Sequence, residues 1–305
     1  MISIFPGSKA KREIEEVIES ALTQDPSMIP LTLAETLYKN SSKLSDSFLL
    51  KVMDDLSKFT FIGGLCLLYH MLRAASESKI SMIREKSPLI YRMLLEMHSA
   101  EDSSVQAYFL QHLSNDSSIA VTGYNSSLIN SLLYSRSKIK VVYALEGYPL
   151  NPGKKLASEL RKAGMDSYHI PDDYVYWVLK RVDVAVIPVY GISGKGWLTT
   201  DSGGVLLGYT ARWAGVKTVG ITIPLAPCTP PKGALKPSRV LLERRIGKER
   251  RRLRFNAYEH VSPDILDYVV TNIGVLKMDS GESIIDAAKA RVADTVATIK
   301  RILEV

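Results

Sequence analysis

The chain has 305 residues, 46% of them hydrophobic and 23% charged, a balance typical of globular proteins with a substantial core. No run of about eighteen apolar residues occurs, and the N-terminal residues pass quickly into a charged helical pattern. We therefore expect a soluble, unexported, cytoplasmic protein without a membrane segment. The formal net charge of +7 favours acidic partners, and much of it is concentrated in one segment, residues 239–254.

Apolar residues recur at helical spacing from Lys9 to about Leu113, as in the series Ile14, Val17 and Ile18. Breakers such as Asp25-Pro26, Gly63-Gly64 and Ser87-Pro88 divide this region into four or five helices. Residues 1–113 are thus predicted to form an all-α helical domain.

After residue 114 the pattern changes to short apolar runs separated by helices, beginning with IAVTG and KVVYALEG. Buried strands that alternate with helices are typical of βαβ units. Residues 114–305 are predicted to form a Rossmann-like α/β domain, a doubly wound parallel sheet of five to seven strands. A last helix, from Ser283 to Leu303, closes the chain.

In such a sheet, ligands bind beyond the carboxyl ends of the strands, where backbone amides and helix N-termini attract phosphate. The candidate ligand-binding residues follow the strands at four places. They are Thr122, Gly123, Tyr124, Asn125, Ser126, Ser127, Glu146, Tyr148, Tyr190, Thr200, Asp201, Gly203 and Gly204. Asp172 and Asp173 are expected to cap the helix that follows them.

Three blocks resemble a known superfamily, which contains ribose-1,5-bisphosphate isomerase, methylthioribose-1-phosphate isomerase and the alpha, beta and delta subunits of translation initiation factor 2B. They are EGYPLNPGKKLASELRKAG, FNAYEHVSPDILDYVVTNIGVL and FIGGLCLLYHMLRAA. The resemblance covers roughly Phe59 to Met278. It implies a helical domain before a Rossmann-like domain, and a homodimer formed through the latter.

The resemblance also implies where catalytic groups would lie. The family's catalytic cysteine falls on Tyr124, its aspartate on Tyr190, its Asn-Lys pair on Thr200 and Asp201, and an arginine on Tyr148. Isomerisation of a sugar phosphate needs an acid or base of tuned pKa, and a tyrosine with a pKa near 10 is a poor replacement for a carboxylate. The substitutions therefore indicate a protein without catalytic residues.

Two interpretations of the cleft stay open. The tyrosines could fill a disused cleft with aromatic bulk. Alternatively, backbone amides of Ser126, Ser127, Gly203 and Gly204 could still bind a phosphorylated small molecule or nucleotide as an effector. We expect a regulatory or binding protein that acts on initiation factor 2 or another acidic protein. An isomerase of altered substrate specificity is the alternative.

The basic segment allows two further interpretations. It could be a solvated surface helix in which basic and acidic residues pair at i,i+4 spacing. It could instead contact RNA or an acidic protein. The candidate contact residues are Arg244, Arg245, Lys248, Arg250, Arg251 and Arg252.

The only two cysteines, Cys66 and Cys228, lie far apart in the sequence and have no metal-binding spacing around them. We expect two reduced thiols, no metal and no cofactor.

Overall fold

A computed structural model describes residues 9–20, 25–77, 79–192, 196–226, 228, 239–246, 249–278 and 282–303. Its helices are α1 Lys9–Ser20, α2 Ile29–Asn40, α3 Asp46–Ser57, α4 Gly63–Ala75, α5 Met82–His112, α6 Ser126–Tyr134, α7 Pro152–Lys162, α8 Val175–Leu179, α9 Gly204–Ala214 and α10 Glu282–Leu303. Its strands are β1 Ser117–Val121, β2 Ile139–Leu145, β3 Ser167–Ile170, β4 Val184–Val189, β5 Gly191–Ile192, β6 Leu198–Asp201, β7 Lys217–Thr222, β8 Arg239–Ile246, β9 Glu249–Asn256, β10 Tyr258–Val261, β11 Tyr268–Thr271 and β12 Gly274–Lys277.

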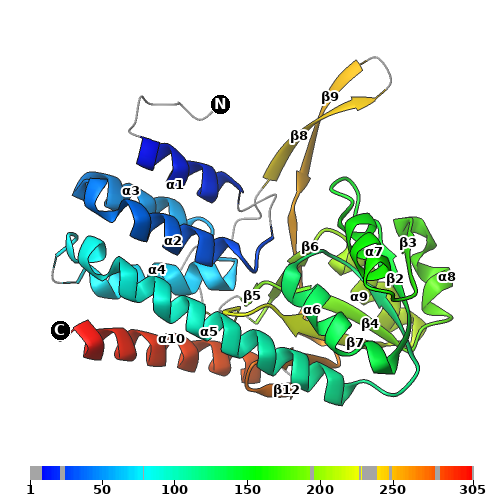
Figure 1. Ribbon diagram of the computed structural model, residues 1–305. Coiled ribbons are helices and arrows are strands. Elements are labelled where there is room, and N and C mark those ends of the chain that lie inside the picture. Colours follow the sequence, from blue (N-terminus) through cyan, green and yellow to red (C-terminus); the bar gives the residue numbers. More distant parts are fainter. Residues whose placement is uncertain are drawn as a thin grey trace.

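The chain begins with the predicted helices and continues into a seven-stranded sheet (Figure 1). The strand order is β12-β11-β7-β4-β1-β2-β3, and every pairing is parallel except that of β11 with β12. The predicted fold class, an N-terminal helical region followed by a doubly wound parallel sheet, is therefore confirmed.

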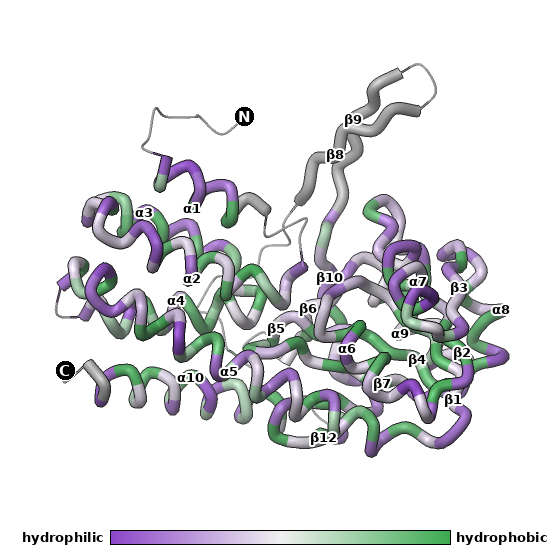
Figure 2. Tube along the Cα trace, in the orientation of Figure 1, coloured by the Kyte–Doolittle hydropathy of each residue, from purple (hydrophilic) through white to green (hydrophobic). Residues whose placement is uncertain are grey.

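Both faces of the sheet are covered, because neighbouring strand residues alternate between two apolar clusters. Ile119 and Val121 of β1 pack with α6, α7 and the end of α5. Ala120 packs on the opposite face with α8, α9 and the start of α10. Figure 2 shows hydrophobic residues gathered on the central strands, whereas α1 and α7 are largely hydrophilic.

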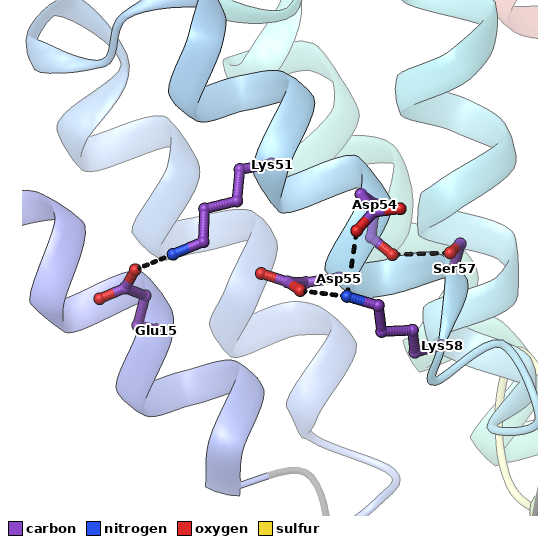
Figure 3. Close-up of polar contacts among 6 residues, drawn as sticks. All are labelled: Glu15, Lys51, Asp54, Asp55, Ser57 and Lys58. Atoms are coloured by element: carbon purple, nitrogen blue, oxygen red, sulfur yellow. Dashed lines mark hydrogen bonds and ion pairs between the residues drawn. The ribbon is translucent and has the colours of Figure 1, made fainter. Parts of the chain in front are cut away.

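A third apolar cluster fills the helical region, where α4 is buried over most of its length. The end of α10 packs there too, since Ile299 belongs to this cluster. Its outer surface has ion pairs, among them Lys51 of α3 with Glu15 of α1 at 2.6 Å (Figure 3). Exposed pairs of this kind each contribute less than about 1 kcal/mol, so the apolar cluster holds the helices together.

The start of α4 is pressed against the segment that follows β7. The amide of Gly63 donates to the Tyr190 carbonyl at 2.6 Å, and a Cβ on Gly63 would collide with the Ala226 backbone. The same segment is held from α5, because the Glu101 carboxylate accepts from the Leu225 amide at 2.8 Å and pairs with Arg291 of α10. We call this contact of α4 and α5 with residues 223–226 and Cys228 the seam.

Cys66 and Cys228 form a disulfide at the seam, so the prediction of two reduced thiols is wrong. Their Cα atoms are 6.1 Å apart, inside the range that a disulfide spans. Local sequence patterns could not predict this pairing because the two cysteines are 162 positions apart, and only the tertiary fold brings α4 to the exit of β7.

The basic segment is a β-hairpin, so the prediction of a surface helix is wrong. Strands β8 and β9 pair in antiparallel register from Arg239 with Asn256 to Ile246 with Glu249. Arginine is a good helix former, but tertiary context overrides propensity, and the interspersed Val, Ile and Phe residues of this segment favour a strand. The hairpin extends away from the sheet in Figure 1.

The described helices include none that is both long enough and apolar enough to span a bilayer.

Candidate functional site

The polar residues predicted at the strand exits meet where the strand order reverses. The chain proceeds from β1 to β2 and β3 on one side and places β4 on the other, so β1 and β4 are neighbours that lead away in opposite directions. A crevice opens at such a switch point. Here it is bounded by the small sheet β10-β6-β5, which continues directly from β4.

A cavity of about 260 Å³ lies at this point. Two of the predicted residues, Tyr124 and Asp201, line it. The other lining residues come from the α1–α2 connection, the start of α7 and the small sheet: Asp25, Pro26, Leu150, Asn151, Pro152, Lys155, Ser202, Ala257 and Tyr258. The helical region and the sheet therefore both contribute to its wall.

Asp201 is the centre of a hydrogen-bond network. Its carboxylate accepts from the Tyr124 amide at 3.1 Å and from the Tyr190 hydroxyl. That hydroxyl accepts from the Asn125 side chain at 3.2 Å, and the Asn125 oxygen caps α6 through the Leu128 amide at 2.8 Å. Gly123 has a φ of +87°, and a Cβ there would collide with the Asp201 carboxylate, so glycine is required.

Burial raises the pKa of the Asp201 carboxyl to about 7, despite hydrogen bonds from Tyr190 and Tyr124 that favour the charged form. The negative charges of Glu259 and Asp25 raise it further. Burial, together with the charge of Asp201, also raises the pKa of the Tyr190 hydroxyl well above 10. At neutral pH the pair is therefore an aspartate close to half-protonation beside a phenol that keeps its proton.

Backbone amides that could bind a phosphate already donate to carboxylates of the chain itself. Ser126, in the first turn of α6, donates to Asp25 at 2.8 Å. Gly203 and Val205, at the start of α9, donate to Glu259 at 3.2 and 3.1 Å. These are the positions where a helix terminus attracts an anion.

Backbone amides of the loop after β2 also donate to a carboxylate of the chain. The Asp172 carboxylate accepts from the amides of Gly147 and Tyr148 at 2.9 and 3.0 Å. The expectation that Asp172 caps α8 is therefore wrong, because Tyr174 occupies that cap position and no side chain caps it. Asp172 instead accepts hydrogen bonds from the loop after β2, which is 24 to 25 positions away in the sequence.

The predicted residues divide into three groups. Tyr124 and Asp201 line the cavity. Thr122, Gly123, Asn125 and Tyr190 contact the lining residues or one another but do not line the cavity themselves. The amides of Ser126 and Gly203 donate to the carboxylates of Asp25 and Glu259. Ser127, Thr200 and Gly204 are buried. Glu146 and Tyr148 lie outside the cavity lining, and Tyr148 is 50% exposed.

Sequence reasoning missed Asp25, Lys155, Tyr258 and Glu259. The ammonium of Lys155 lies 4.1 Å from the centre of the Tyr124 ring, and the rings of Tyr258 and Tyr190 meet edge to face at 5.5 Å. Lys155, Tyr258 and Glu259 belong to two of the three blocks that carry the family resemblance, which was the available signal. Asp25 gave none beyond its place before a proline.

Of the predicted basic contacts, Arg244 and Arg245 lie on β8, and Arg250, Arg251 and Arg252 lie on β9. Lys248 lies outside the described residues.

Known proteins with similar sequences and structures point to one family. Its model, the Initiation factor 2 subunit family, matches residues 11–278. Translation initiation factor eIF2B subunit beta of Schizosaccharomyces pombe is 25% identical over 185 residues, which cover 57% of this chain and 47% of that protein. The match thus spans about half the length of this curated relative.

Two solved structures show the same fold. The translation initiation factor eIF-2B of Pyrococcus horikoshii has a TM-score of 0.72 at 15% identity, covering 89% of this chain and 98% of that one. The 5-methylthioribose 1-phosphate isomerase of the same organism has a TM-score of 0.63 at 14% identity, covering 94% and 88%. Because the family model extends from α1 to the residue that follows β12, the chain belongs to the initiation factor 2 subunit family.

Proposed function

We propose that the chain is a regulatory member of this family that binds partners without catalysing a reaction. The observation that carries the proposal is the pairing of the amides around the cavity with the protein's own carboxylates, Asp25, Asp201 and Glu259. The backbone amides that could bind an anion already donate hydrogen bonds to these carboxylates, so they need no substrate phosphate as a partner.

Electrostatics support this proposal. A phosphate at the start of α6 or α9 would have to displace a carboxylate and then remain close to the others. Two unit charges 4 Å apart interact by about 1 kcal/mol in water and by about 4 kcal/mol near a protein surface, so this repulsion is costly. Lys155 alone supplies a cation among the residues that line the cavity.

The chemistry of the cleft supports it too. At the positions that the family resemblance assigns to the catalytic cysteine and aspartate, this chain has Tyr124 and Tyr190. The raised pKa of Tyr190 keeps its hydroxyl protonated at neutral pH, so it cannot accept a proton from a sugar carbon.

The test is incubation of the purified chain with 5-methylthioribose 1-phosphate, followed by carbon NMR of the sugar. We expect the aldose signals to persist without a ketose. Conversion at ordinary enzymatic rates, of roughly 1 per second or faster, would refute a non-catalytic role.

One observation favours the alternative, an isomerase of altered specificity. Asp201 has a pKa of about 7 and faces the cavity, which are the properties of a general acid or base. Screening phosphorylated aldoses separates the two functions. Turnover that disappears in Asp201→Asn but persists in Asp173→Asn, a matched change outside the cavity lining, would support the enzyme.

We propose a homodimer formed through the surface of α8 and α9. Trp177 and Trp213 are 60% and 73% exposed there, and both contact Tyr176 through ring centres 5.5 and 5.0 Å away. Exposed aromatic clusters of this kind mark interaction surfaces. One relative is described as a tetrameric eIF2B-beta2-delta2 complex from C. thermophilum, so such subunits do assemble.

Sedimentation velocity tests the dimer. The wild type is expected to sediment as a dimer and Trp177→Glu/Trp213→Glu as a monomer, with Leu50→Glu on the helical region as the control. A wild type that stays monomeric at tens of micromolar would contradict the proposal.

We further propose that the chain works in the cytoplasm and that its basic hairpin contacts an acidic surface of initiation factor 2 or of another translation protein. RNA is the competing partner. Binding to single-stranded RNA that falls steeply with salt and is lost in Arg250→Ala/Arg251→Ala/Arg252→Ala would favour RNA over protein.

Binding of a phosphorylated effector would appear in isothermal titration calorimetry as saturable heat release without chemical conversion of the effector.

A further inference from the structure

The disulfide at the seam has a third potential metal ligand beside it. The sulfur atoms of Cys66 and Cys228 and a ring nitrogen of His70 all lie within 4.8 Å of one another. Both cysteines are fully buried, whereas His70 is partly exposed. These are the residue types that bind soft and borderline metals such as Zn²⁺.

The backbone geometry suits a metal site. Cys66 and His70 are four residues apart on α4, so they lie on the same face of one helix. This is the spacing by which paired helical ligands hold zinc. Cys228 approaches from the other side of the seam with its Cα 6.1 Å from that of Cys66, so rotation of the two side chains can place both sulfurs around one ion.

The oxidation state decides whether the site exists. A disulfide offers no thiolate, whereas a dithiol reductant converts it to two thiols and itself becomes a disulfide, a transfer of two electrons and two protons. Zn²⁺ then displaces one proton from each thiol. In the reducing cytoplasm of the proposed function the thiol form is favoured, and the disulfide is then not available to cross-link the seam.

We propose that the reduced chain binds one Zn²⁺ through the Cys66 and Cys228 thiolates and the His70 imidazole, and that exchange with an external disulfide, which takes up two electrons and two protons and becomes two thiols, re-forms the Cys66–Cys228 bond and releases the ion. A water completes the tetrahedron, as in zinc sites with three protein ligands. The seam is then cross-linked in both states, by the metal when reduced and by the disulfide when oxidised. This replaces the expectation of a chain without a metal site.

The probe is Co²⁺, whose spectrum reports thiolate ligands. The full chain is reduced with a phosphine, freed of reductant under anaerobic conditions, and titrated with CoCl₂. We expect a thiolate-to-cobalt charge-transfer band that saturates at one equivalent and disappears on addition of one equivalent of ZnCl₂. Since the chain has two cysteines in all, the band reports these two. The oxidised chain is expected to show no band.

Variants identify the third ligand. His70→Ala should weaken Co²⁺ binding roughly 100-fold or more, since loss of even an outer-shell partner costs 10–100-fold. His169→Ala, at an exposed position on β3, is the matched control and should bind as the wild type does. Circular dichroism verifies that each reduced variant is folded.

Three results would overturn the proposal. They are a folded, reduced chain without a charge-transfer band, His70→Ala binding Co²⁺ as tightly as the wild type, and a disulfide that the phosphine cannot reduce unless the chain is unfolded. The last result would make the bond a permanent structural cross-link.

Discussion

Two of the contacts between the helical region and the α/β part of the chain are built differently. At the seam, Gly63 lets α4 approach the Ala226 backbone, apolar residues surround the contact, and a disulfide closes it. At the cavity, the contact between the α1–α2 connection and α6 is polar. It consists of the Asp25 carboxylate on the Ser126 amide and a hydrogen bond between the hydroxyls of Ser27 and Ser126 at 2.9 Å.

The difference shows which junction fixes the position of the helices and which can open. Each hydrogen bond at the cavity contributes about 1 kcal/mol net, because water replaces it when the junction separates. The seam combines close packing with a covalent bond, and neither has a replacement in water. We therefore expect the cavity to open by local separation at Asp25 while the seam stays closed.

The largest expected effect comes from cutting the seam. Cys66→Ser/Cys228→Ser, compared with the oxidised wild type without metal, should lose up to about 5 kcal/mol in free energy of unfolding. This is the chain-entropy estimate for so long a loop, and measured losses run from about 2 to 5 kcal/mol. Urea denaturation measures it. A loss below about 1 kcal/mol would show that packing alone holds the seam.

The next effect concerns the charge of Asp201. Its folded pKa is raised, so the native state binds the proton more tightly than the unfolded state does. The contribution of Asp201 to stability therefore falls as pH rises from about 4 to about 7 and is constant above that. Asp201→Asn removes this dependence.

The measurement is the difference in free energy of unfolding between Asp201→Asn and the wild type at pH 5 and pH 8. It should shift in favour of the variant by at most about 3 kcal/mol across this interval, from about two units at 1.36 kcal/mol each. Asp173→Asn serves as the control. A difference that does not change with pH would contradict the raised pKa.

A smaller effect is expected at the start of α9. Glu259→Ala leaves the amides of Gly203 and Val205 without their carboxylate and should cost about 1 to 2 kcal/mol, as the loss of a helix cap does. Glu259→Gln retains an acceptor and should cost less. Thermal unfolding of both variants tests the order, and equal losses would assign the effect to charge instead of hydrogen bonding.

The smallest effect should come from Asp25→Ala, at about 1 kcal/mol in global stability, because the loss of its hydrogen bonds from Ser126 and Ser27 is partly offset by relief of its repulsion with Asp201. Its signature is local. Amide hydrogen exchange should accelerate in the first turn of α6, at Ser126 and Ser127, while the rate at Val121 of β1 stays unchanged. Uniform acceleration across the sheet would show that the two junctions are not independent.

Much of the fold follows from hydrophobic periodicity, because local patterns report local structure. Runs such as VAVIP became buried parallel strands, and the helical spacing from Lys9 onward became five helices. The strand exits were predictable for the same reason, since Tyr124 and Asp201 each follow or end a recognisable strand.

The missed features all depend on contacts between distant residues. Asp25 reaches Ser126 across 101 positions, Glu259 reaches Gly203 across 56, and Cys66 reaches Cys228 across 162. Hydrophobic periodicity does not report contacts between residues so far apart in the sequence. The hairpin was mistaken for a different reason, because arginine is compatible with both secondary structures and charge pairing at i,i+4 suggested the wrong one.

The connection between hairpin and cavity has a mechanical consequence. Strand β9 ends at Asn256 and β10 begins at Tyr258, so a single residue separates the projecting hairpin from the ladder in which Tyr258 pairs with Asp201. Backbone of fixed bond length transmits displacement over so short a distance. A partner that displaces β9 is thus expected to move the edge of the cavity, where Glu259 accepts from the first amides of α9.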